Sequence, residues 1–186
     1  MVRTLDPRRR QSSPLKEISL MNADANLNLD ALNKRALKNA MGCFATGVTV
    51  VTTNVDGQDF GMTCNSFNTV SLDPAMVLWS IRRASTNFDI YTRAEGYTVN
   101  ILSASQQEDA MRFAKGTQEE RFNGVELRRL QSGRLNLVGA TAWFDCEMYN
   151  VVEAGDHDIL IGRVLSFASN GAAPLGYLNG EFVELA

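Results

Sequence analysis

Hydrophobic positions along the chain follow two different spacings. Between residues 30 and 44 apolar side chains recur every three or four positions, which predicts an amphipathic helix over 31–42 with Asp30 as its N-cap. From Val48 onward apolar and small polar residues alternate, as in a half-buried strand, and Asp56-Gly57 is a typical hairpin turn. We predict strands over 47–55, 61–70, 76–81, 97–102, 138–152, 158–168 and 177–185. Two short helices are predicted between them, from Ser85-Thr86 to about Ala94 and over 105–114.

This pattern favours a mainly β fold, in which an antiparallel sheet closes into a barrel with few short helices. A Rossmann domain is disfavoured because its regular long helices and its G-x-G-x-x-G fingerprint are both missing. Residues 1–28 hold few bulky apolar side chains, two prolines and the basic run 8–10. Such a composition predicts a disordered leader over 1–28, followed by one domain over 29–186.

Composition narrows the function classes. The formal net charge is -3, and no apolar run approaches the roughly 20 residues of a membrane helix, so neither nucleic acid nor membrane is expected as a partner. The single histidine, His157, excludes a multi-histidine metal centre. Three cysteines without C-x-x-C spacing suggest neither a disulfide framework nor a zinc site, so no metal is expected and the predicted location is cytoplasmic.

Candidate chemistry lies in two polar stretches between strands, 61–67 and 80–86, because the sequence contains neither a G-x-S-x-G elbow nor an H-E-x-x-H motif. Their Thr, Asn and Ser side chains offer hydrogen bonds, and glycine lets a ligand approach the backbone. Ser85 and Thr86 at a helix start, with Arg82 nearby, have the chemistry of a phosphate site.

Each feature also has a purely structural explanation. Ser or Thr before a helix is commonly only an N-cap, and polar residues in a strand can be the wet face of a half-buried sheet. Cys64 fits a small core residue, and its neutral neighbours give no reason to expect a reactive thiolate. His157 lies in Ala-Gly-Asp-His-Asp, where a role in a hairpin turn is the simplest interpretation.

Six segments, taken together and in order, resemble the flavin reductase-like domain of the FMN-binding split barrels, the reductase component of two-component flavin-dependent monooxygenases. They are Phe-Ala-Thr-Gly-Val-Thr-Val-Val-Thr (44–52), Gly-Met-Thr-Cys-Asn-Ser-Phe-Asn-Thr-Val-Ser-Leu-Asp-Pro (61–74), Tyr-Thr-Val-Asn-Ile-Leu (97–102), Gly-Ala-Thr-Ala-Trp-Phe-Asp-Cys (139–146), Ala-Gly-Asp-His-Asp-Ile (154–159) and Pro-Leu-Gly-Tyr (174–177). The resemblance implies an antiparallel Greek-key split β-barrel that forms a homodimer, with the flavin near the dimer interface.

The resemblance also implies site residues. Those expected to border the isoalloxazine ring are Gly61, Met62, Thr63, Asn65 and Ser66. Ser80, Ile81 and Arg82 are expected at the ring edge and ribityl chain, Ser85 and Thr86 at the phosphate, and the helix carrying Phe113 over the site. Gly155, Asp156 and His157 are the nicotinamide-side candidates, and His157 is also the catalytic candidate.

The implied activity is an NAD(P)H:flavin oxidoreductase that reduces FMN or FAD, with NADH favoured and NADPH possible, and supplies diffusible reduced flavin to a monooxygenase. Hydride transfer between cofactors needs positioning more than strong acids and bases, which agrees with a chain poor in catalytic side chains. Two alternatives stay open: a reductase of the same fold whose acceptor is a corrinoid or ferric complex, and a flavin-binding protein without turnover.

Overall fold

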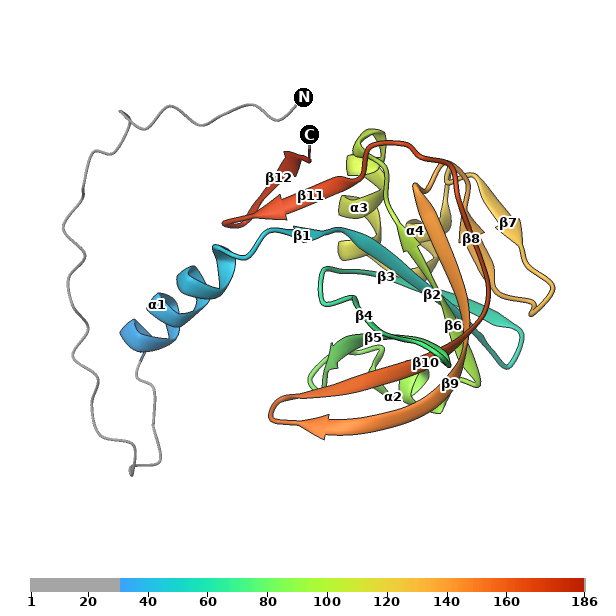
Figure 1. The fold of residues 1–186 in the computed structure, drawn as a ribbon, viewed down its shortest axis with the longest axis horizontal. Helices are drawn as coiled ribbons and strands as arrows, with labels where there is room; N and C mark the ends of the chain where they lie inside the picture. Colours follow the sequence, from blue (N-terminus) through green and yellow to red (C-terminus); the bar gives the residue numbers. More distant parts are fainter. Residues whose placement is uncertain (1–30, 186) are drawn as a thin grey trace.

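The computed structural model describes residues 31–185, and the predicted leader lies outside this range (Figure 1). The first strands are β1 (Thr46–Gly47), β2 (Thr49–Val55), β3 (Gln58–Cys64), β4 (Asn68–Leu72), β5 (Ala75–Arg82) and β6 (Gly96–Ile101). The later strands are β7 (Leu127–Arg129), β8 (Leu135–Leu137), β9 (Ala142–Ala154), β10 (His157–Ser169), β11 (Leu175–Leu178) and β12 (Glu181–Glu184). The helices are α1 (Ala31–Gly42), α2 (Phe88–Arg93), the 3-10 turn η1 (Ala104–Gln106), α3 (Gln107–Ala114) and α4 (Gln118–Phe122).

Seven strands form one antiparallel sheet in the order β3-β2-β6-β9-β10-β5-β4. The strands β3 and β4 are consecutive in sequence yet lie at opposite edges of this sheet. The short turn between them therefore requires the sheet to curl until its edges approach, which makes a barrel that is open between β3 and β4. The expected mainly β, antiparallel barrel fold is confirmed.

Three of the predicted strands differ in extent from the strands in the structure. The range 61–70 is two strands, because β3 pairs with β2 whereas β4 pairs with β5 on the other edge. The range 177–185 is the β11–β12 hairpin, whose turn residues Asn179 and Gly180 have φ of 53° and 91°. Strand β9 begins at Ala142 rather than at 138, and β7, β8 and α4 were not predicted.

The three predicted helices are present, two of them with shifted starts. The helix over 31–42 is α1, as expected. Helix α2 begins at Phe88, so Ser85 and Thr86 lie in the preceding turn and Asn87 takes the N-cap position. The helix expected over 105–114 begins as η1 and continues as α3.

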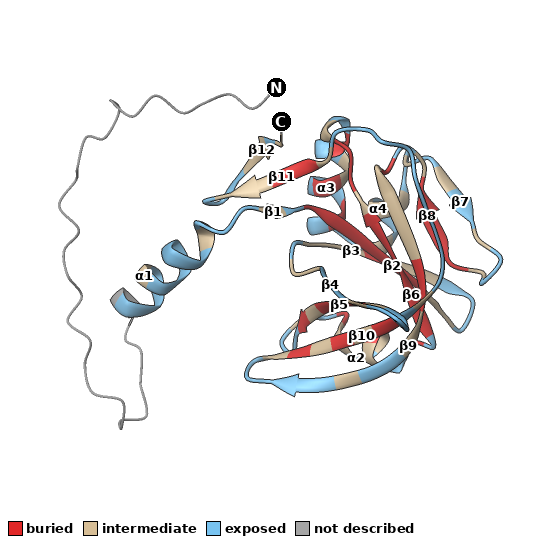
Figure 2. Cartoon of the chain, viewed as in Figure 1, coloured by how far each residue is buried: buried red, intermediate tan, exposed pale blue. Residues whose placement is uncertain are grey.

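Strand β2 is buried on both faces, as its colour in Figure 2 shows. Successive side chains of a strand point to opposite faces, so Val51 packs into a cluster with Trp79 and Tyr97. Val50 packs into a second cluster, which includes Phe113 from α3. The core therefore has two layers, one inside the curled sheet and one between the sheet and α3.

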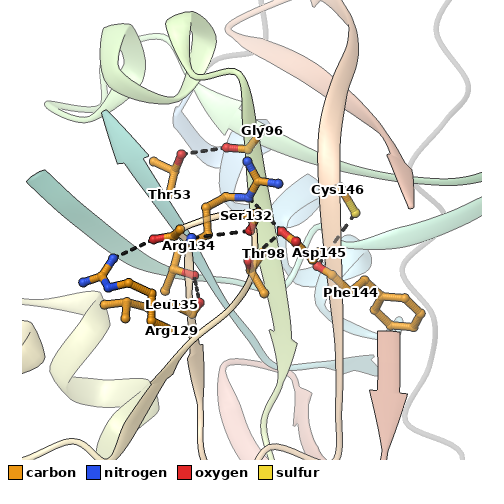
Figure 3. Close-up of polar contacts among 12 residues, drawn as sticks. Thr53, Gly96, Thr98, Arg129, Ser132, Arg134, Leu135, Phe144, Asp145 and Cys146 are labelled. Carbon is orange, nitrogen blue, oxygen red and sulfur yellow. Dashed lines mark hydrogen bonds and ion pairs between the residues drawn. The ribbon is translucent and has the colours of Figure 1, made fainter. Parts of the chain in front are cut away.

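Buried polar contacts join the β7–β8 hairpin to the main sheet (Figure 3). Arg134, just before β8, pairs with Asp145 of β9 through Nε and Oδ1 at 2.7 Å. The hydroxyl of Thr98 on β6 donates to the same Oδ1 at 3.3 Å. These contacts lie in the interior, so the hairpin is held by desolvated hydrogen bonds.

Helix α1 projects from the barrel and is exposed over most of its surface (Figures 1 and 2). Its end is joined to the β11–β12 turn by a hydrogen bond from Asn179 N to Gly42 O at 2.8 Å. Leu37, Met41 and Phe44 are exposed. Within residues 31–185, no helix has the length and apolar character needed to cross a membrane.

Candidate functional site

A cleft of about 410 Å³ opens at the end of β3. It is lined by Val48, Thr63, Cys64, Asn65, Ala110, Met111, Ala114, Tyr177, Gly180 and Phe182. A second cleft, of about 960 Å³, lies between α1 and the barrel and shares Asn65, Tyr177 and Gly180 with the first. Both volumes fall in the usual range of small-molecule sites, roughly 300 to 1,000 Å³.

The polar side chains at this cleft differ in the hydrogen bonds they have left to offer. The Thr63 hydroxyl donates to Ala110 O at 2.6 Å, so toward a ligand it can only accept. Asn65 is exposed, and its side-chain amide has no hydrogen-bond partner within residues 31–185. Asn65 can therefore still both donate to a ligand and accept from one at this cleft.

Ser66 joins the β3–β4 turn to β5. Its hydroxyl accepts from Ser80 N at 2.9 Å and donates to Ser80 O at 3.0 Å. Because the one hydroxyl proton is used in this contact, Ser66 fixes the position of the turn rather than donating to a ligand. The pair brings two of the predicted segments, 65–66 and 80–82, side by side.

Strand pairing brings the third predicted segment to the same strand. In the β5–β10 register His157 lies opposite Arg82 and Asp158 opposite Ile81. Arg83 N donates to Asp156 O at 2.9 Å, and the Arg83 side chain pairs with Asp158 at 2.6 Å. The expected phosphate-side arginine and the expected nicotinamide-side residues are therefore neighbours.

His157 is half-exposed, and its Nδ1 lies 2.7 Å from Asp156 Oδ1. This hydrogen bond and the charge on a protonated His157 lower the pKa of Asp156, with a smaller contribution from Arg82. Because a carboxylate only accepts, Nδ1 carries the proton in this contact. The other ring nitrogen, Nε2, is left available for a ligand.

Ser85 and Thr86 lie in the turn after β5. Ser85 N donates to Arg82 O at 2.9 Å, and the Ser85 hydroxyl accepts from Asn87 N at 3.2 Å. This leaves the Ser85 hydroxyl proton free to donate. Thr86 and Arg82 are exposed beside it.

Three predicted site residues are buried. Phe113 and Ile81 are core residues, and Gly61 lies beneath Phe113, where an added Cβ would come within 2.5 Å of the Phe113 ring. Met62 is partly buried against the inner cluster. The structure therefore separates these four residues from the accessible polar side chains of Thr63, Asn65, Arg82, Ser85 and Thr86, and in this arrangement a flavin would contact them through their backbone.

Cys64 lines the cleft and contacts Thr49, whose hydroxyl lies 3.1 Å from the thiol and donates to Cys64 O. Burial raises the pKa of the Cys64 thiol, although hydrogen bonds from Thr49 and the 66–67 backbone oppose the shift. The thiol is therefore protonated at neutral pH, in agreement with the core-residue interpretation.

Several lining residues were not predicted from the sequence. Tyr177 falls in one of the resembling segments, which was a usable signal, but Ala110, Met111 and Phe182 carry no chemistry of their own. They line the cleft because α3 and the β11–β12 hairpin pack beside the end of β3. Across residues 31–185 no three His, Cys, Asp or Glu side chains gather as a metal site.

The residues present fit a flavin. The cleft combines apolar walls from Val48, Met111 and Phe182 with the accepting hydroxyl of Thr63 and the free amide of Asn65. A planar ring with polar edges needs such a site. Arg82 and the Ser85 hydroxyl supply a cation and a donor of the kind that binds phosphate.

Comparison with known proteins agrees with this chemistry. Residues 41–186 match the model of the Flavin reductase like domain family. The reductase component of a flavin-dependent trigonelline monooxygenase from Acinetobacter baylyi is 45% identical over 156 residues, covering 83% of this chain and 50% of that protein. The FMN reductase (NADH) SmoA of Agrobacterium fabrum is 37% identical over 150 residues, covering 81% of this chain and 85% of that protein.

A solved structure supports the same conclusion. The NADH:FAD oxidoreductase SgcE6 of Streptomyces globisporus, in complex with NAD and FAD fragments, is 31% identical and aligns with a TM-score of 0.79, covering 85% of this chain and 96% of that chain. The chain spans about half the length of the Acinetobacter relative. The match over 41–186, on a barrel of the same fold, shows that this chain belongs to the flavin reductase like domain family.

Proposed function

We propose that this protein is an NADH:flavin oxidoreductase that reduces FMN or FAD and supplies the reduced flavin to a separate monooxygenase. The observation that carries the proposal is the β5–β10 register, which places His157 opposite Arg82. With the Ser66–Ser80 contact, it aligns three segments expected for ring, phosphate and nicotinamide along adjacent parts of the barrel. Membership of the flavin reductase like domain family supports the proposed assignment of these segments.

Flavin binding is assigned mainly to the accessible polar side chains at the cleft and in the turn after β5. Thr63 and Asn65 border the isoalloxazine ring, with Gly61, Met62 and Ser66 behind them. Ser80, Ile81 and Arg82 follow the ring edge and ribityl chain. Ser85 and Thr86 donate to the phosphate, Arg82 supplies its counter-charge, and α3, which carries Phe113, covers the cleft.

Bound flavin supplies the hydride chemistry itself, and the protein binds, orients and excludes water. The Asn65 amide can donate to a ring carbonyl, where negative charge grows on reduction, while the Thr63 hydroxyl can accept from a ring N–H. Gly155, Asp156 and His157 are assigned to the nicotinamide. Because the Nδ1 proton of His157 is directed to Asp156, Nε2 of the neutral ring can accept from the carboxamide N–H, and Nε2–H of the doubly protonated ring can deliver a proton.

A homodimer is proposed from the exposed apolar side chains of β4 and β10. Leu72 is 97% exposed and Phe167 is 70% exposed, with Val70 and Leu165 exposed on the same two strands. Exposed apolar side chains of this size are what an interface with a second copy would cover. The free thiols of Cys43, Cys64 and Cys146 support a cytoplasmic location.

Stopped-flow mixing with NADH tests the activity. The protein loaded with FMN or FAD is expected to lose flavin absorbance at 450 nm within seconds, about the range of ordinary turnover. A protein that only binds flavin leaves the absorbance unchanged, which would refute the proposal. Steady-state NADH oxidation is expected to rise with added free flavin. If it does not rise, a bound flavin serving another acceptor, such as a corrinoid or ferric complex, replaces this function.

A further inference from the structure

Gly61 on the edge strand β3 has both backbone polar groups occupied by side chains from α4. Gly61 N donates to Gln118 Oε1 at 2.9 Å, and Arg121 Nη1 donates to Gly61 O at 2.8 Å. An edge strand otherwise presents unpaired N–H and C=O groups. Helix α4 therefore satisfies both backbone groups of Gly61, two residues before Thr63.

Gln118 makes a second contact away from β3. Its Nε2 donates to Asn87 Oδ1 at 3.1 Å. Asn87 is only 7% exposed and stands at the N-cap of α2, yet its side chain makes no capping hydrogen bond. An N-cap asparagine ordinarily accepts from the first helical turn, so here its oxygen is committed to Gln118 instead.

Asn87 in turn sets the position of Ser85. Asn87 N donates to the Ser85 hydroxyl at 3.2 Å, which orients that hydroxyl and leaves its proton for a ligand. One amide side chain thus links β3 to the 85–87 turn.

The backbone at Gln118 is held in place by a capping box. Thr117 N donates to Glu120 Oε2 at 2.7 Å and Glu120 N donates to Thr117 Oγ1 at 3.3 Å, a capping box around the first turn of α4. Gln118 occupies the first position of that turn. The capping box therefore holds the backbone from which the Gln118 side chain makes its two contacts.

We propose that Gln118 is a positioning residue that holds the 85–87 turn at a set distance from β3 and so determines how strongly the site prefers a phosphorylated flavin to one without phosphate. The inference rests on the proposed function, which places the ring at the end of β3 and the phosphate at Ser85. Breaking the link releases the turn but leaves Thr63, Asn65 and the cleft walls in place. FMN should then lose affinity while riboflavin should not.

Two variants break the link from opposite ends. Gln118→Met keeps the length of the side chain and removes both of its hydrogen bonds. Asn87→Ser keeps a good N-cap residue but is too short to reach Gln118, and it leaves the Gln118 contact to Gly61 intact. Gln58→Met, at the exposed start of β3, is the matched control. Thermal unfolding of each variant verifies that it is folded.

The measurement is the dissociation constant of FMN and of riboflavin, from quenching of flavin fluorescence by the full-length protein. Loss of one or two hydrogen bonds predicts about a 3- to 10-fold weaker FMN affinity in Gln118→Met and Asn87→Ser. Riboflavin affinity should stay within about twofold, as should both affinities in Gln58→Met. The double variant Gln118→Met/Asn87→Ser should lose no more FMN affinity than the single variant with the larger loss, because both substitutions break the same link.

Three results would overturn the inference and leave the proposed function standing. They are an equal loss of FMN and riboflavin affinity in the single variants, no change in either affinity, and additive losses of FMN affinity in the double variant. If the unsubstituted protein binds neither flavin, the proposed function and the inference both fail.

Discussion

Arg134 and Asp145 form an ion pair in the interior of the barrel, with Nε 2.7 Å from Oδ1 and side chains 10% and 5% exposed (Figure 3). Arg134 enters from the β7–β8 hairpin and Asp145 belongs to β9, so the pair joins an appended hairpin to the main sheet. Thr98 donates to the same carboxylate oxygen. Two desolvated charges are tolerated here because each satisfies the other.

Removing one partner should strongly destabilise the fold. Arg134→Met leaves Asp145 buried without its counter-charge, and we expect the free energy of unfolding in urea to fall by about 3 to 5 kcal/mol. The control is Arg163→Met, which breaks the partly exposed pair of Arg163 with Glu147 and should lower the free energy of unfolding far less, because solvent screens that pair. Similar losses in the two variants would contradict the role given to the buried pair.

Gly61→Ala should also destabilise the protein. The new Cβ would lie 2.5 and 2.7 Å from two atoms of the Phe113 ring and 3.1 Å from Phe122, and Phe113 cannot move because it is fully buried. Overpacking of this kind costs about 1 to 3 kcal/mol, measurable by urea unfolding. Gly47→Ala is the control, since nothing lies within 4 Å of its added Cβ. If Gly61→Ala left the free energy of unfolding unchanged, α3 would have to move away from β3 easily.

Thiol labelling should single out Cys43. Its side chain is exposed, whereas burial raises the pKa of the Cys64 thiol and, with help from Asp145, raises that of Cys146 to about 12. A thiol reacts as its thiolate, so a raised pKa lowers the reactive fraction at pH 8. Iodoacetamide followed by peptide mass spectrometry should find Cys43 modified first. Labelling of Cys64 at the same rate would show that the cleft opens readily in solution.

His157→Ala tests the nicotinamide assignment. Loss of one hydrogen bond from Nε2 should raise the KM for NADH by roughly 3- to 10-fold. The FMN dissociation constant should not change, because the assigned flavin residues are untouched. Unchanged steady-state NADH kinetics would remove His157 from the mechanism.

The β10 pairing shows why some site contacts were beyond sequence reasoning. The Gly-Asp-His turn and the Arg82 segment are both visible in the sequence, yet 75 residues separate Arg83 from its partner Asp158. Their contact follows from strand register, which depends on the packing of whole strands. The same holds for Gln118, which carries no motif and gains its importance only by contacting β3 and Asn87.

The sequence by itself determined most of the secondary structure and indicated the position of the candidate site. The change from helical to alternating spacing predicted α1 and most strands, because periodicity is a local property. The polar stretches 61–67 and 80–86 indicated the candidate site for the same reason, since side-chain type is also local. The tertiary structure alone decided that 61–70 divides between opposite sheet edges, that Phe113 and Ile81 are core, and that Arg134 meets Asp145. These outcomes depend on which distant strands pair and what they bury, and no local pattern encodes that choice.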